Sequence, residues 1–151
     1  MEGINPKTDR KSIGISRTFD SIDDIHEIRR RIMIMARHIV YMAMKIEANP
    51  TSYFLKIHYE HPVRVKQSVT VNRIFSEALF KSTLSKMYEE IALERGAIKL
   101  TLNVSNFTSQ HTRTLSLMDL DEDIKQQALS AKLHKLRERF GLDIIKTADE
   151  L

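Results

Sequence analysis

The stretch KSIGISRTF, residues 11–19, has the alternation of a strand with one buried face. We expect its apolar residues and its small polar residues to lie on opposite faces, since side chains alternate along a strand. The inward set is Ile13, Ile15, Arg17 and Phe19, and the outward set is Ser12, Gly14, Ser16 and Thr18. An exposed strand face this short, polar and uncharged raises the question of what it contacts.

Length and composition limit the classes of protein to be considered. A chain of 151 residues with 42% hydrophobic and 29% charged residues fits one globular domain with a real core. It has no cysteine, which excludes disulfides, thiolate metal sites and a cysteine nucleophile. No apolar run reaches membrane-span length, and the opening MEGINPKTDR lacks the apolar segment of a signal peptide. We therefore expect a cytoplasmic protein.

The periodicity along the chain predicts the order of its elements. Helical spacing of apolar residues predicts helices over 22–48, 75–95 and 121–140, with Asp20 or Ser21 as the first N-cap and Gly96 and Gly141 as stops. Alternation predicts a hairpin over 52–71, turning at Glu60-His61-Pro62, and a strand over 97–107. The methionines at 33, 35, 42 and 44 could suggest a promiscuous groove, but core filling is the favoured interpretation.

The predicted order through residue 107 is βαββαβ, which indicates an α+β fold. We expect a four-stranded antiparallel sheet covered on one face by two helices, plus a C-terminal helical extension. The expected organisation is a linker over 1–10, a domain over 11–107, a second linker over 108–120, and a C-terminal helix and tail over 121–151. Such a sheet leaves its second face open, and the small residues of 11–19 would lie on that face.

The basic residues are concentrated in the predicted strands. Segments 11–19, 51–75 and 97–113 contain eight basic residues and one acidic residue, so their net charge is +7. Because the whole chain has a net charge of +4, the remaining residues have a net charge of −3. A basic sheet on an acidic body is typical of a protein that binds a polyanion. The alternative is a solvated edge whose lysines discourage aggregation.

The residue types on the outward face favour a duplex backbone as the ligand. No aromatic residue is expected there, so base stacking is disfavoured, whereas small hydroxyls, glycine and backbone amides allow close approach of phosphates. The predicted DNA-binding residues are Ser12, Gly14, Ser16, Arg17, Lys56, His58, Arg64, Lys66, Ser68, Thr70, Lys99, Thr101, Asn103 and Ser105. The alternative function is a protein-interaction module that holds an acidic partner through the same basic sheet.

No catalytic or metal-binding motif is expected in this chain. Asp119, Asp121 and Asp123 resemble the start of a calcium loop, but Ile124 and Ser130 replace its glycine and its bidentate glutamate, so these acids are expected to begin a helix. His58 and His61 have a metal-like spacing but flank a turn with no further ligand nearby in the sequence. We therefore predict neither a catalytic nor a metal site.

Four segments together resemble the little-finger domain of Y-family translesion DNA polymerases, and within that family the UmuC/ImpB/MucB branch. These segments are KSIGISRTF, FLKIHY…QSVTV, AIKLTLNVSNF and KLHKLRERFG, and the resemblance covers about residues 10–145. It implies an open sheet face that grips primer-template DNA without sequence preference, during lesion bypass in DNA repair and the SOS response. The polymerase palm would precede residue 1, so catalysis and its Mg²⁺ are implied only for the parent protein, and no cofactor is expected in this piece. The resemblance also makes a regulatory subunit of the polymerase a candidate partner.

The resemblance further implies a sliding-clamp peptide after the last strand. The matching residues are Leu115, Ser116, Leu117 and Met118, preceded by Thr114. The family peptide is similar to Gln-Leu-Ser-Leu-Phe, so the two leucines fit while both terminal anchors differ. An apolar linker that packs on its own domain is an equally open interpretation of this segment.

Overall fold

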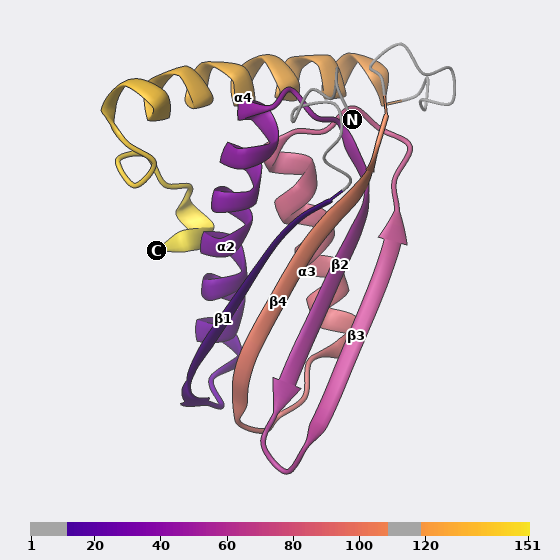
Figure 1. Cartoon of the computed structure of the whole chain (residues 1–151), viewed down its shortest axis with the longest axis vertical. Helices are drawn as coiled ribbons and strands as arrows, with labels where there is room; N and C mark the ends of the chain where they lie inside the picture. The colour runs from indigo at the N-terminus through magenta and orange to yellow at the C-terminus, as the bar shows by residue number, and fades with distance from the viewer. Residues whose placement is uncertain (1–11, 109–118) are drawn as a thin grey trace, which may run out of the picture.

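The computed structural model describes residues 12–108 and 119–151. Their elements follow the order β1 (Ser12–Ile22), α2 (Ile25–Lys45), β2 (Pro50–Tyr59), β3 (Val63–Thr70), α3 (Glu77–Ile91), β4 (Ala97–Phe107) and α4 (Leu120–Phe140), as Figure 1 shows. A short 3₁₀ helix, η1 (Ala148–Glu150), lies at the C-terminal end. The predicted βαββαβ order with a C-terminal helix is confirmed.

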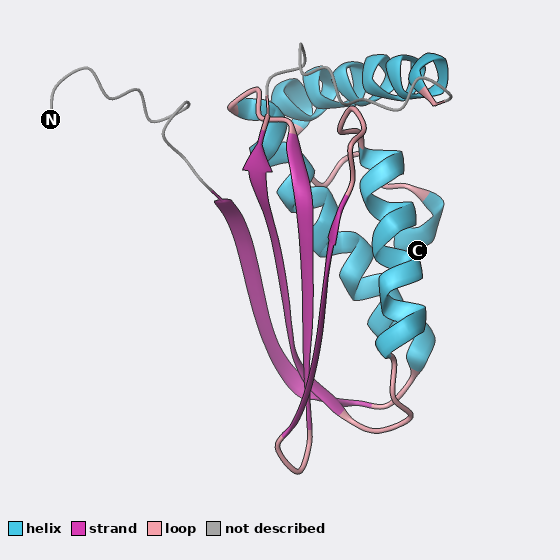
Figure 2. Cartoon of the chain, turned by 90° about the vertical axis from the view of Figure 1, so that its right-hand side faces the viewer, coloured by secondary structure: helices cyan, strands magenta, loops and turns pink. Residues whose placement is uncertain are grey.

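The four strands form one antiparallel sheet in the order β1-β4-β2-β3. Helices α2 and α3 lie against one face of this sheet, and the opposite face carries no covering element among the described residues (Figure 2). Helix α4 runs across the end of the molecule far from the β2–β3 turn (Figure 1). The expected α+β architecture with one open sheet face is therefore correct.

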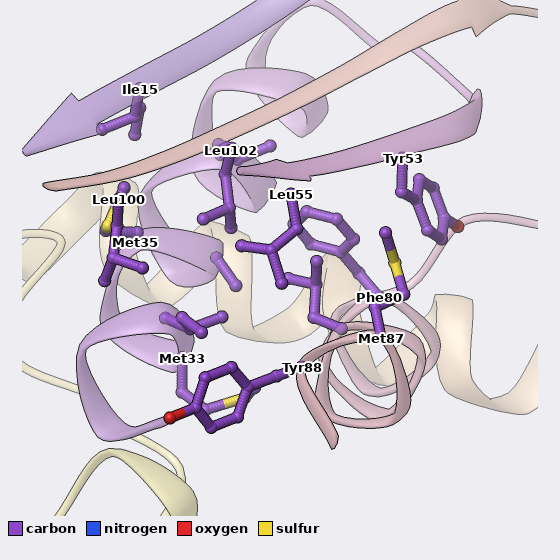
Figure 3. Close-up of a cluster of buried hydrophobic side chains, with 14 of the residues drawn as sticks. Ile15, Met33, Met35, Tyr53, Leu55, Phe80, Met87, Tyr88, Leu100 and Leu102 are labelled. Atoms are coloured by element: carbon purple, nitrogen blue, oxygen red, sulfur yellow. The ribbon is translucent and has the colours of Figure 1, made fainter. Parts of the chain in front are cut away.

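The core lies between the sheet and the two covering helices. It is built from the inward residues of the strands and the apolar stripes of the helices, including Leu55, Leu100, Leu102 and Phe80, all fully buried (Figure 3). Burying such a side chain contributes about 1.5–3 kcal/mol relative to leaving it exposed. Met33 and Met35 are buried, and Met42 and Met44 pack against the same cluster, so core filling is the correct interpretation of the methionines.

Both helices that cover the sheet are shorter than predicted: α2 spans Ile25–Lys45 rather than 22–48, and α3 spans Glu77–Ile91 rather than 75–95. Strand β1 continues to Ile22, and the N-cap of α2 is Asp24, whose carboxylate accepts a 2.9 Å hydrogen bond from the His26 amide, rather than Asp20 or Ser21. Helix α3 ends at Ile91 instead of reaching residue 95. Gly96 therefore does not stop this helix. It allows close packing instead, because a Cβ at this position would lie 1.9 Å from the Ser21 hydroxyl oxygen.

Helix α4 docks with a polar face rather than with the predicted apolar stripe. Its buried residues are Asp123, Ser130 and Arg137, which are spaced seven apart along one side. The apolar residues of this helix, which we expected to dock on the body or on a neighbouring chain, are substantially exposed in the single chain: Ile124 51%, Leu129 50%, Leu136 43% and Phe140 55%. The predicted stop at Gly141 is correct, since this residue has φ 108° at the helix end.

A buried ionic cluster joins α2, α3, α4 and the C-terminal tail. Lys81 Nζ lies 2.9 Å from both Glu77 Oε2 and Glu150 Oε2, and Arg37 Nε lies 2.6 Å from Glu150 Oε1. Arg137 Nη1 completes the cluster at 2.5 Å from Glu77 Oε1. Arg37, in the middle of α2, is thus only 1% exposed.

None of the helices in the described ranges is long and apolar enough to cross a membrane.

Candidate nucleic-acid interface

The register of the sheet arranges the open face in four rows of side chains across the strands. Residues directly opposite each other in an antiparallel sheet share a face, with their Cβ atoms about 4.5–5.5 Å apart. In the order β1, β4, β2 and β3, two uncharged rows are Ser12–Ser105–Ser52–Thr70 and Gly14–Asn103–Phe54–Ser68. The two charged rows are Ser16–Thr101–Lys56–Lys66 and Thr18–Lys99–His58–Arg64.

The charged rows place cations opposite cations, toward the β2–β3 turn. Lys56 faces Lys66 across one strand pair, and His58 lies between Arg64 and Lys99. Like charges directly opposite each other on a sheet are destabilising. No acidic residue occurs in the four rows, and none of these Lys and Arg side chains forms an ion pair within the described part of the chain. The positive charge on this face is therefore uncompensated.

The electrostatics of the charged rows also act on His58. Loss of solvation lowers the pKa of His58, and the positive charges of Arg64, Lys56 and Lys99 lower it further. The imidazole is therefore neutral at neutral pH in the free domain. A phosphate bound between these cations would oppose that effect, since a nearby negative charge favours the protonated form.

Small hydroxyl groups line the rest of the open face. Ser16 Oγ and Thr101 Oγ1 lie 2.9 Å apart, and Ser52 Oγ and Thr70 Oγ1 lie 3.2 Å apart. Each hydroxyl can both donate and accept, so these pairs retain capacity for a further hydrogen bond to a ligand. This part of the face can hydrogen-bond to an oxygen-rich ligand but supplies no charge of its own.

Thirteen of the fourteen predicted DNA-binding residues share the open face. They are Ser12, Gly14, Ser16, Lys56, His58, Arg64, Lys66, Ser68, Thr70, Lys99, Thr101, Asn103 and Ser105. Arg17 is separated from them: it lies with Ile13 and Ile15 on the helix side of β1 and lines a pocket against α2. The alternation of the strand had already indicated this side for Arg17.

The predicted DNA-binding set omitted three residues of the open face, of which Thr18 was already expected to point outward, and one of the three corrects a prediction. Phe54 is half-buried between Asn103 and Ser68, so the expectation that this face carries no aromatic residue is wrong. The strand alternation, extended back from Lys56 by two residues, is the signal that identifies it. Ser52 and Thr18 are the other two, and the same alternation places them on this face.

The acidic residues before α4 take a structural position. Asp121 and Asp123 lie in the first turn of the helix, as predicted, and Asp119 immediately precedes it. Asp123 Oδ1 accepts a 2.7 Å hydrogen bond from Arg73 Nη2, so this carboxylate ties α4 to the segment after β3. In residues 12–108 and 119–151, no three His, Asp or Glu side chains are grouped closely enough to hold a metal ion.

The predicted clamp-binding residues Leu115, Ser116, Leu117 and Met118 lie outside the described residues.

Comparison with known proteins gives one family and many similar solved structures. Residues 10–117 match the model of the impB/mucB/samB family C-terminal domain. A complex of beta-clamp processivity factor and the little finger domain of PolIV is 21% identical, with a TM-score of 0.48, over 70% of this chain and 97% of that chain. The Y-family DNA polymerase chimera Dbh-Dpo4(243-245)-Dbh is 14% identical, with a TM-score of 0.47, over 65% of this chain and 29% of that chain. No curated protein sequence matches significantly.

Proposed function

The chain belongs to the impB/mucB/samB family of C-terminal domains, the little-finger domains of Y-family polymerases, and on that basis we propose that its open sheet face binds the backbone of duplex DNA without sequence preference. The domain would hold primer-template DNA for a translesion polymerase during lesion bypass. The proposal concerns this face only.

The observation that carries the proposal is the uncompensated charge of the two charged rows. Lys56 and Lys66 lie opposite each other, and Arg64 and Lys99 flank His58, with no carboxylate in either row. This arrangement is unfavourable in the free domain and becomes favourable when phosphates lie between the cations. The hydroxyls of the neighbouring residues supply hydrogen bonds that fix a backbone in place without reading bases.

The width and composition of the face favour DNA over an acidic protein. The rows extend across all four strands and are lined mainly by hydroxyl, amide and cationic groups. Protein interfaces usually contain an apolar centre with several aromatic or aliphatic anchors, whereas Phe54 is the single large apolar residue in these rows. An extended polar and positive surface matches a phosphate backbone better.

A titration against short duplexes of unrelated sequence tests the proposal. Each neutralised phosphate contributes about −0.9 to the slope of log affinity against log salt, so the four cations Lys56, Arg64, Lys66 and Lys99 imply a slope of roughly −3 to −4. The affinity should be nearly independent of sequence. If no DNA binding is measurable at low salt, the acidic-partner alternative becomes the better explanation of the charged rows.

We also propose a sliding clamp as a partner, on the sequence of residues 114–118 alone. A peptide spanning 112–120 should bind a bacterial sliding clamp weakly, because both leucines of the family peptide are present. Replacing Thr114 by Gln and Met118 by Phe should tighten the binding. Undetectable binding by both peptides would remove this segment as a clamp motif.

The wider role follows from family membership and remains part of the proposal. The parent protein would be a DNA-directed DNA polymerase whose palm holds Mg²⁺, acting in the cytoplasm and in the SOS response, with a regulatory subunit as a candidate partner. The gene sequence upstream of Met1 tests this directly, because a palm with paired carboxylates should be encoded there.

A further inference from the structure

A second basic site lies on the other side of β1, under the outer edge of the sheet. A pocket of about 310 Å³ opens there between β1 and one face of α2. Its walls combine basic side chains with apolar ones, and the complete lining is Arg17, Thr18, Phe19, Arg30, Arg31, Ile34, Met35, His38 and Leu100. The pocket shares only Thr18 with the four rows of the open face, because β1 lies between the pocket and those rows.

The cations of this pocket exceed the carboxylates that face them. Glu27 accepts hydrogen bonds from Arg30 Nη2 at 2.8 Å and from Arg31 Nε at 2.9 Å, so one carboxylate serves two guanidinium groups. These bonds lower the pKa of Glu27 to about 2, and it stays ionised. Arg17 adds a third guanidinium, whose Nη1 donates a 3.0 Å hydrogen bond to the backbone carbonyl of Ser16. The site thus carries an excess of two positive charges.

Guanidinium donors remain available to a ligand. Arg31 Nε donates a hydrogen bond to Glu27, and the two Nη groups of Arg31 have no hydrogen-bond partner within the described residues. The Arg31 guanidinium lies over the Phe19 ring, 5.1 Å from its centroid, which fixes its orientation at the pocket. Guanidinium groups are suited to bidentate binding of carboxylates and phosphates.

The apolar part of the pocket and the position of β1 define the kind of ligand. Ile34 is the partly exposed apolar residue next to the guanidinium groups, and the buried Met35 and Leu100 lie behind it at the base of the pocket. Strand β1 is an edge strand that pairs only with β4 in the described sheet, and an extended peptide can add to such an edge while its side chains enter adjacent pockets. A sugar-phosphate backbone offers no apolar side chain for this surface.

We propose that the pocket between β1 and α2 binds an extended acidic peptide segment, with a carboxylate on Arg17 and Arg31 and, two residues further along the peptide, an apolar side chain against Ile34. The partner is a protein segment with an acidic residue and a large apolar residue two positions apart, because only every second side chain of an added strand faces the pocket. Because this site and the open face lie on opposite sides of β1, the domain could hold DNA and the peptide at the same time. The inference does not depend on the proposed DNA binding.

Nuclear magnetic resonance on the labelled domain tests the inference with two capped peptides. The probe is Gly-Asp-Ser-Ile-Ser-Gly, in which the Asp and Ile side chains share one face of an extended chain, and its matched control has the Asp replaced by Asn. The acidic peptide should shift the backbone amides of residues 17–19 and 30–38, and the Asn peptide should not. Arg31→Gln should weaken the acidic peptide about tenfold, as expected for the loss of a charge-assisted pair.

Lys45→Gln is the control variant, because it removes one charge from the exposed end of α2, outside the pocket. It should bind the peptide as the unaltered domain does, and both variants should bind duplex DNA normally. The inference is overturned if neither peptide shifts these amides, if both shift them equally, or if the acidic peptide shifts only the open face. It is also overturned if a short DNA duplex, rather than the acidic peptide, shifts residues 17–19 and 30–38, since the ligand would then be a phosphate backbone.

Discussion

Arg137 of α4 donates a hydrogen bond to Glu77 at the start of α3, with 2.5 Å between Nη1 and Oε1, and both side chains are almost completely buried. Glu77 also contacts Lys81, which in turn contacts Glu150 in the C-terminal tail. The C-terminal helix and tail are therefore attached to the domain by buried charges. A buried charge whose partner is removed is costly, so this attachment is sensitive to single substitutions.

Glu77→Gln should destabilise the domain by about 3–5 kcal/mol, because Arg137 and Lys81 would share a buried site without their common carboxylate. Denaturant unfolding measures the loss. Leu136→Ala is the matched control: Leu136 is 43% exposed on the same helix, so its truncation should cost far less. Equal losses for the two variants would mean that the exposed apolar side of α4, rather than its polar side, stabilises the fold.

Amide exchange in residues 120–140 should be slow in the unaltered domain and faster in Glu77→Gln. The helix is anchored at three points of one side, by Asp123 to Arg73, Ser130 to the Glu77 amide, and Arg137 to Glu77. An isolated helix of this length is marginal in water, so protection reports the docking. Exchange at the rate of an unfolded peptide would show that the docking does not persist in solution.

Acid should weaken the buried cluster. Burial raises the pKa of Glu77 and of Glu150, but hydrogen bonds from Arg137 to Glu77, and from Lys81 and Arg37 to Glu150, outweigh it and leave both values below the ordinary 4.5. Since these folded-state pKa values are depressed, the stability they supply is present above about pH 4.5 and is lost as the pH falls through the folded values. Unfolding midpoints measured from neutral to acidic pH should decrease in this window. Glu150→Gln should flatten the decrease, and an unchanged pH profile would contradict the assignment.

Sequence periodicity predicts the sheet well and the attachment of α4 poorly, for a physical reason. The alternation in β1 and β4 reflects burial of one face, which is a local property, so most of the open face could be assigned from it. The burial of Arg37, Asp123 and Arg137 depends on partners between 50 and 113 residues away, and no local pattern contains that information. Apolar residues in α4 do recur at helical spacing. The side that docks is nevertheless the one whose buried charged residues, Asp123 and Arg137, find partners in the body of the domain.

Lys66→Ala and Lys99→Ala should each weaken duplex DNA binding and flatten its salt dependence by about one unit of slope. The reason is that each side chain lies in a charged row and would neutralise one phosphate. Fluorescence anisotropy at several salt concentrations measures both quantities. Lys45→Ala, on the helical side, is the matched control and should leave them unchanged. If Lys45→Ala lost as much DNA affinity as these variants, the open sheet face would not be the DNA-binding face.

Gly14→Ala should leave the fold intact and weaken DNA binding about tenfold or less. A Cβ at Gly14 would meet its nearest neighbour, the Leu102 carbonyl oxygen, at 3.4 Å, which is an ordinary contact, so the domain accommodates it. The methyl group would instead project from the open face toward a closely approaching backbone. Thermal unfolding and anisotropy separate the two effects. Unchanged affinity would mean that the ligand does not approach β1 closely.

Phe54→Ser should weaken DNA binding without changing its salt slope. Phe54 lies in an uncharged row between Asn103 and Ser68, beside the cations but without charge of its own. A contact between its ring and a deoxyribose or a base releases no counterion, so the loss should appear as a parallel shift of log affinity against log salt. Stacking of a base on an aromatic ring contributes about 1–3 kcal/mol, which corresponds to roughly five- to 150-fold in affinity and is the upper limit for this contact.

Phe54→Leu separates ring stacking from apolar contact. Leucine keeps an apolar side chain in the central strand β2, so the variant should fold like the unaltered domain and recover only part of the lost affinity if the ring itself stacks on the ligand. Full recovery would indicate apolar contact with a sugar. If Phe54→Ser binds DNA as tightly as the unaltered domain, the ring packs within the sheet and does not contact the DNA. The DNA would then contact only the hydroxyls and cations around Phe54.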